Sequence, residues 1–207
     1  MNESEIPPYL APYQRAAKRH GGEFEALCWT SLIEQTARFK AMIEVYDFAS
    51  KRMIDAGCGR ADFFDYLTSR GIIPANYLGL EAICPLADRA KHKTRANFAI
   101  LNEDFLISGF PPDFFPDVIV FSGTLNTFKV KSLQTALHSA LEATRDTVVF
   151  NYLCKPDKAG APWLAWHTEN EIRSLIKSSS CEVSFHGGYL DGDVTVVAKR
   201  TRSFIPT

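Results

Sequence analysis

The most informative segment of this chain is residues 53–67, where a short apolar run meets a glycine-containing turn and then a helical pattern. The apolar run ends at Asp55, and Gly57 and Gly59 follow, separated by Cys58. Glycine lets the backbone approach a ligand closely, and the start of the next helix offers free N–H groups to it. The segment therefore predicts a strand, a tight turn and a helix at a nucleotide-type cofactor.

The residue three positions after Gly59 indicates what kind of cofactor this is. Dinucleotide-binding turns place Gly or Ala there, against a pyrophosphate, whereas this chain has Asp62. A carboxylate suits the positive end of a helix but repels a diphosphate at close range. We therefore expect a ligand without phosphates.

Two further apolar segments also end in acids. Residues 77–81 form a strand pattern ending at Glu81, at the distance downstream where an acid binds ribose hydroxyls, and residues 98–105 end in Asp104 and Phe105. The carboxyl ends of parallel strands meet at one ligand crevice, so these acids should converge there. A local alternative is that Asp55 only caps the turn that follows it and that Asp104 is a solvated loop residue.

The turn resembles the first motif of class I S-adenosylmethionine-dependent methyltransferases, an acid followed by three alternating glycines. Asp55, Gly57 and Gly59 match it, and Ala61 stands where the third glycine is usual. If that position needs a positive φ, Ala61 should reduce cofactor affinity. The resemblance implies S-adenosylmethionine as the cofactor, with Gly57 and Gly59 against its amino-acid portion.

The resemblance also implies roles for residues at the later strand ends. Asp104 would accept from the adenine amino group, Phe105 would pack on the ring, and Ser122 would border the transferred methyl. Either Ala82 or Ile83 would touch the adenine, because Pro85 falls one residue later than in the commoner pattern. Arg38 is either a partner for the methionine carboxylate or an exposed helix charge. The expected cofactor set is Asp55, Gly57, Cys58, Gly59, Glu81, Ala82, Ile83, Asp104, Phe105, Ser122 and Arg38.

Charge and cysteine content exclude several other classes. The formal net charge of −1 leaves no basic excess for nucleic acid. The five cysteines form no C-x-x-C pair, so neither a metal site nor a disulfide framework is expected. Residues 1–5 are acidic and prolines follow, which predicts no signal peptide and no membrane span. These features favour a cytoplasmic protein.

Hydrophobic periodicity predicts an α/β fold in which a doubly wound, mostly parallel seven-stranded sheet carries a C-terminal antiparallel hairpin. Two helices over 9–20 and 23–48 come first. Strands are expected at 51–55, 76–81, 97–102, 117–121 and 146–151, and helices at 60–70, 84–96, 130–145 and 168–177; the hairpin takes 181–186 and 194–199. We divide the chain into an N-terminal helical extension over the cleft, residues 1–50, and a cofactor-binding domain, residues 51–207.

The acceptor side of the site is less well marked. Trp29, Asn126, Tyr152, Trp163 and His167 are the candidate acceptor-binding residues, although both tryptophans and the histidine also suit packing roles. No catalytic base is evident. The chain lacks the Asn/Asp-Pro-Pro-aromatic motif of amino-directed nucleic-acid methyltransferases and the Pro-Cys of cytosine-C5 enzymes, so a small-molecule or protein acceptor is favoured.

Three functions follow from the sequence. The leading one is an enzyme that transfers a methyl group from S-adenosylmethionine. A second is a degenerate member of the same fold that binds the cofactor or a partner without turnover, which Ala61 and the missing base suggest. The third, a nicotinamide-dependent oxidoreductase, is disfavoured by Asp62 and the terminal hairpin.

Overall fold

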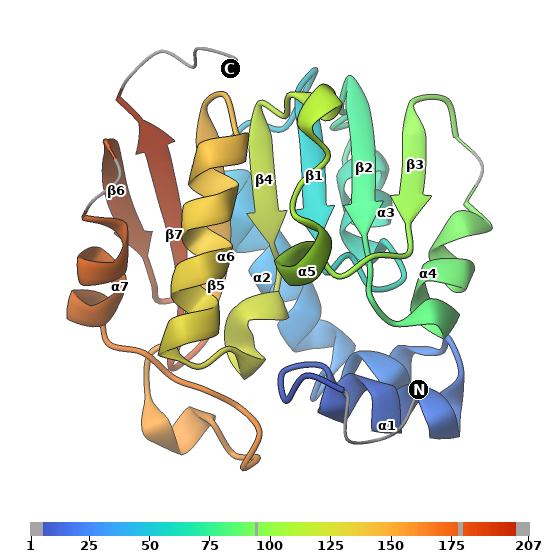
Figure 1. Cartoon of the computed structure of the whole chain (residues 1–207), viewed down its shortest axis with the longest axis horizontal. Coiled ribbons are helices and arrows are strands. Elements are labelled where there is room, and N and C mark those ends of the chain that lie inside the picture. Colours follow the sequence, from blue (N-terminus) through green and yellow to red (C-terminus); the bar gives the residue numbers. More distant parts are fainter. Residues whose placement is uncertain (1–5, 94, 178–179, 202–207) are drawn as a thin grey trace.

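The computed structural model describes residues 6–93, 95–177 and 180–201, and residues 1–5, on which the expected absence of a signal peptide rested, lie outside it. A seven-stranded sheet of order β3-β2-β1-β4-β5-β7-β6 spans the molecule (Figure 1). Its strands are β1 Arg52–Ala56, β2 Asn76–Leu80, β3 Phe98–Leu101, β4 Val118–Phe121, β5 Thr147–Leu153, β6 Cys181–His186 and β7 Asp193–Arg200. β7 runs antiparallel to both of its neighbours, β5 and β6, and the other strand pairs are parallel. The predicted fold class is confirmed.

Helices cover both faces of this sheet, as a largely parallel sheet requires. They are α1 Ala11–His20, α2 Leu32–Val45, α3 Asp62–Ser69, α4 Cys84–Lys91, α5 Phe105–Ser108, α6 Val130–Ala143 and α7 Glu169–Ile176. The described connections contain the 3₁₀ turns η2 Phe24–Leu27, η3 Pro112–Phe114, η4 Thr124–Thr127 and η5 Pro156–Lys158. Among the described helices, none is both long enough and apolar enough to cross a membrane.

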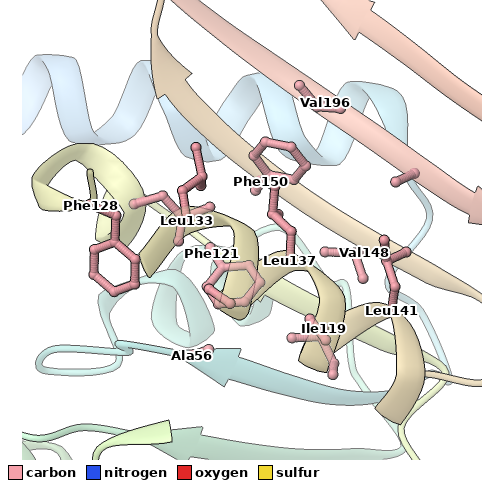
Figure 2. Close-up of a cluster of buried hydrophobic side chains, with 14 of the residues drawn as sticks. Ala56, Ile119, Phe121, Phe128, Leu133, Leu137, Leu141, Val148, Phe150 and Val196 are labelled. Atoms are coloured by element: carbon pink, nitrogen blue, oxygen red, sulfur yellow. The ribbon is translucent and has the colours of Figure 1, made fainter. Parts of the chain in front are cut away.

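One face of the sheet packs against α6. Leu133, Leu137 and Leu141 recur at helical spacing and lie over the inner residues of β4 and β5, which Figure 2 shows. Ile119 pairs with Val148 in the sheet, and all seven residues of β5 are buried. On the other face, Phe39 and Met42 of α2 join the core formed with α3. The central strands are therefore held from both sides, and their carboxyl ends are fixed in position.

The N-terminal region differs from the predicted pair of long helices. Cys28 has φ +57°, and the Ser31 hydroxyl accepts from the Glu34 N–H at 3.2 Å. A left-handed residue followed by an N-cap breaks the expected helix over 23–48, so only η2 and α2 form there. The helix predicted for 84–96 is also shorter, since α4 ends at Lys91.

The N-terminal segment from residue 6 to α1 lies across the carboxyl ends of the strands. Figure 1 shows α1 below the arrowheads of β1 to β3. A small separate cluster of Ala17, Ala26, Ile83 and Leu86 joins α1 and η2 to the start of α4. The proposed boundary at residue 50 stays a prediction, although α2 shares the central core rather than this cluster.

Candidate active site

A cavity of about 340 Å³ lies at the carboxyl ends of the strands, under the N-terminal segment. It brings together twelve of the residues expected at the site from sequence. From the cofactor set these are Arg38, Gly57, Gly59, Glu81, Ala82, Ile83, Asp104, Phe105 and Ser122; from the acceptor set they are Trp29, Asn126 and Trp163. Their assignment to cofactor or acceptor stays a prediction.

The turn after β1 needs both of its glycines. Gly57 has φ +75°, and a Cβ there would lie 2.5 Å from Thr124 Cγ2. Gly59 has φ +56°, and a Cβ there would lie 2.5 Å from Leu27 Cδ2. The Thr124 hydroxyl donates to the Ala56 carbonyl at 2.8 Å, which holds it against the turn. Because Gly57 and Gly59 have no side chains, the backbone of the turn itself lines the cavity.

Ala61 takes the left-handed conformation that the third glycine position of the motif would suit. Its φ is +57°, it is fully buried, and it precedes the first residue of α3. Lys93 donates to the Ala61 carbonyl at 3.0 Å and pairs with Asp65 at 2.6 Å. These contacts hold a strained residue in place at the start of the helix.

Ala61→Gly is expected to raise the free energy of unfolding by about 0.5 to 1 kcal/mol, because glycine adopts a positive φ without the strain of an L side chain. Urea denaturation measures this. The matched control is Ala87→Gly, in the buried interior of α4, which should lose about 1 kcal/mol. Equal losses in the two variants would contradict strain at Ala61.

Glu81 links the ends of the first two strands. Its Oε2 accepts from the Gly59 N–H at 2.7 Å, and its Oε1 accepts from the Ile83 N–H at 2.7 Å. Burial raises the pKa of this carboxyl to about 7, although both backbone hydrogen bonds favour the charged form. Glu81 therefore lines the cavity as a carboxylate that titrates near neutral pH.

Asp55 and Cys58 do not line this cavity. They lie at an adjoining cavity of about 30 Å³, together with Gln35, Asp62 and Ser122. Asp55 accepts from the Tyr77 hydroxyl at 2.6 Å, and burial raises its pKa to about 7. Burial also raises the pKa of the Cys58 thiol well above its usual value. Asp55 thus contacts Tyr77 of β2, and Cys58 Sγ would lie 2.6 Å from a Cβ at Gly79 of the same strand, so both side chains pack the turn against β2.

Asp104 is engaged by two local partners. Its Oδ1 accepts from the Leu106 N–H at 2.9 Å, so it caps α5, a short helix that the sequence pattern did not predict. Its Oδ2 accepts from the Tyr9 hydroxyl at 2.6 Å. The Tyr9 carbonyl in turn accepts from the Thr127 hydroxyl at 3.0 Å. Asp104 is therefore the N-cap of a short helix rather than a solvated loop residue, and it also lines the cavity.

Arg38 is not an exposed helix charge, since only 7% of it is accessible. Its guanidinium pairs with the carboxylate of Asp193 and lies 4.6 Å from the centre of the Trp29 ring. Asp193 also accepts from the Tyr189 hydroxyl. The Arg38 guanidinium, which we expected to bind the methionine carboxylate, is therefore already paired with Asp193.

Two of the expected acceptor-binding residues lie away from the cavity. Tyr152 is buried in the core beside α6. His167 is also buried, and its Nε2 donates to the Phe128 carbonyl at 2.9 Å. His167 therefore has the packing role that the sequence offered as its alternative. The described residues hold no group of His, Cys, Asp and Glu side chains placed to bind a metal ion.

The cavity also contains residues that sequence reasoning missed. Tyr9 and Tyr13 line it from the N-terminal segment, and Lys158, Leu190, Asp191 and Asp193 line it from the loops around β5 and β7. The two tyrosines are four residues apart within the helix expected over 9–20, and this spacing could have predicted that they share one face. Asp193 carried none, since its partner Arg38 is 155 residues away.

No family model and no curated protein sequence matches the chain. Among solved structures, magnesium protoporphyrin IX methyltransferase from Synechocystis PCC 6803, with bound S-adenosylmethionine, superposes with a TM-score of 0.70 at 10% identity, over 97% of this chain and 100% of that one. N-methyltransferase NodS from Bradyrhizobium japonicum WM9, with S-adenosyl-L-homocysteine, gives 0.66 at 13% identity, over 92% and 100%. The chain has the class I methyltransferase fold.

This methyltransferase fold accommodates different acceptors. Human N-acetylserotonin methyltransferase, in complex with S-adenosylmethionine, superposes with a TM-score of 0.67 at 12% identity, over 93% of this chain and 62% of that one. A porphyrin and an acylated amine are named as substrates of two of these proteins. The fold alone therefore leaves the acceptor to be argued from the residues of the cavity.

Proposed function

We propose that this protein is an S-adenosylmethionine-dependent methyltransferase acting on a small-molecule acceptor. The observation that carries the proposal is the convergence of the Gly57–Gly59 turn, Glu81 and Asp104 on one cavity at the carboxyl ends of β1 to β3. That is where an open α/β sheet binds its ligands.

The residues present fit this cofactor. Gly57 and Gly59 leave backbone at the cavity wall, and Ile83 and Phe105 supply apolar surface for an adenine ring. At the ends of β2 and β3, Glu81 and Asp104 are the only charged residues among the described lining residues. This part of the cavity therefore suits ligands with hydroxyl and amino donors. A cofactor with a positively charged sulfur and no phosphates matches that acidic surface.

When bound, S-adenosylmethionine supplies a methyl group on a positively charged sulfur. Gly57, Gly59, Glu81 and Asp104 would hold the cofactor, whose methyl group would be available to a lone pair of an acceptor bound in the same cavity. The chain contributes mainly alignment of the two molecules, which is worth about 7 to 11 kcal/mol in favourable cases. A cavity without an evident base is compatible with this chemistry.

Calorimetry with S-adenosylhomocysteine, S-adenosylmethionine and NAD tests the cofactor class. We expect one molecule of either sulfur compound to bind per chain, and no heat from NAD. Transfer of labelled methyl groups to a panel of acceptors then tests turnover. Binding of NAD in place of the sulfur compounds would support the oxidoreductase instead, and cofactor binding without transfer to any acceptor would support the degenerate binder.

Binding of S-adenosylhomocysteine is expected to weaken about tenfold between pH 8 and pH 6, because ribose hydroxyls bond to the ionised Glu81, whose pKa is about 7 in the free protein. As the pH falls through that value, binding must first remove a proton. Glu81→Gln separates this effect from the titration of Asp55, whose pKa is also raised to about 7, and should flatten the profile.

At pH 8, Glu81→Ala should weaken binding by about 1.5 to 3 kcal/mol, the range for hydrogen bonds to a charged group. Calorimetry on folded variants measures both effects. A variant whose free energy of unfolding changes while its dissociation constant does not would make Glu81 purely structural.

Replacing Asn126 or Trp163 with alanine is expected to reduce methyl transfer at least tenfold while leaving the dissociation constant for S-adenosylhomocysteine within about threefold. Both residues line the cavity beyond β4, away from Glu81 and Asp104. Trp166→Ala is the matched control, since Trp166 is 42% exposed and does not line the cavity. Equal losses of transfer and cofactor binding would assign Asn126 and Trp163 to the cofactor instead.

A further inference from the structure

The half of the cavity beside β4, β5 and β7 differs chemically from the half that we assign to the cofactor. The sheet order places β4, β5 and β7 on one side of β1, and β2 and β3 on the other. The end of β5, the segments after β4 and β5 and the turn before β7 supply Asn126, Leu153, Lys158, Trp163, Leu164 and Leu190. We call these six residues the acceptor wall.

Both cations of this half already have carboxylate partners that line the same cavity. Lys158 Nζ lies 2.9 Å from Asp191 Oδ2, and Arg38 pairs with Asp193. No other Lys or Arg is found among the described lining residues, and Glu34 adds a further acid. An anionic acceptor would therefore meet two lining cations that already have carboxylate partners, and Glu34 as a further acid.

The rest of the acceptor wall is apolar except for one amide. Leu153, Leu164, Leu190 and the half-buried ring of Trp163 form a surface suited to an aromatic or aliphatic body. Asn126 is 7% exposed, and its Oδ1 has no hydrogen-bond partner in the described chain. A buried oxygen without a partner favours a ligand that brings a hydroxyl or N–H donor.

We propose that the methyl acceptor is an uncharged, largely apolar aromatic molecule that carries a hydroxyl or N–H group, and that molecules with a carboxylate or phosphate are rejected. This inference rests on the proposed function, since it takes the acceptor wall as the place of the second substrate. Rejection follows because an anion would either stay unpaired beside three acids or displace one of the existing carboxylate partners.

Two probes of nearly equal shape test the charge rule, by which we mean the rejection of anionic acceptors. They are 2-naphthol, which is uncharged at pH 7, and 2-naphthoate, which is an anion. Calorimetry on protein saturated with S-adenosylhomocysteine should give a dissociation constant at least tenfold lower for naphthol. Trp163→Ala should weaken naphthol at least fivefold. Naphthoate binding as tightly as naphthol, or neither probe binding at all, would overturn the inference.

Asp191→Asn supplies the sharper comparison. It removes the carboxylate shared by Lys158 and Lys155, whose Nζ lies 2.6 Å from Asp191, and it lies at an exposed turn where folding should persist. We expect naphthoate to gain at least fivefold and naphthol to change less than twofold. An unchanged ratio between the probes would overturn the charge rule. The binding of S-adenosylhomocysteine, titrated first on each sample, separately tests the proposed function.

Discussion

Gly59→Val is expected to weaken the binding of S-adenosylhomocysteine by about 100-fold or more, equivalent to about 2.7 kcal/mol. The backbone at Gly59 has φ +56°, where a β-branched residue is strained, and its Cβ would lie 2.5 Å from Leu27 Cδ2. The turn must shift or Leu27 must move into the cavity. Either change also displaces the Gly59 N–H that orients Glu81.

Gly71→Val is the matched control for this substitution. Gly71 has a similar φ of +73°, but a Cβ there would meet no atom within 4 Å. It should therefore show the cost of strain to folding while keeping the cofactor affinity of the wild type. Calorimetry and urea denaturation are measured on both variants. A folded Gly59→Val protein with unchanged affinity would refute the placement of the cofactor against this turn.

Asp193→Ala is expected to lower the free energy of unfolding by about 3 kcal/mol, because it leaves a buried guanidinium without its partner. The side chains of Arg38 and Asp193 are 9% and 1% exposed, and the Tyr189 hydroxyl loses its acceptor at the same time. Urea denaturation measures the loss. A cost below about 1 kcal/mol would show that water from the cavity solvates Arg38.

The double variant Arg38→Met with Asp193→Leu separates the two possible roles of Arg38. Replacing both partners of a buried pair with apolar residues often restores stability. The free energy of unfolding of the double variant should therefore be closer to that of the wild type than the value for Asp193→Ala is. If Arg38 binds the methionine carboxylate, this folded double variant loses cofactor affinity. Unchanged affinity would assign Arg38 to the ion pair alone.

Hydrophobic periodicity predicted where the strands lie along the chain. Strands buried on both faces are nearly continuous apolar runs, as at Val118–Phe121. Helix ends were less predictable. The break at Cys28 is a left-handed residue with no glycine to mark it, and α5 is a short helix nucleated by the Asp104 cap. Such features depend on local hydrogen bonds that hydrophobic spacing does not report.

The candidate site divides in a similar way. Gly57, Gly59 and Glu81 were predicted to lie together because each sits at a strand end, and strand ends of a parallel sheet converge. Tyr9 and Asp193 were missed because they reach the cavity from the two extremities of the described chain. Their neighbours, Asp104 and Arg38, are 95 and 155 residues away in sequence. Only tertiary packing creates those contacts.

The small cluster that attaches α1 and η2 to α4 has a consequence for the kinetics of binding. Ile83 and Leu86 serve both as the docking surface of the first helix and as a wall of the cavity. A ligand that fills the cavity therefore adds contacts to a segment held by only a few apolar residues, and slows its local opening. Ligand residence time and hydrogen-exchange protection of α1 should therefore rise together.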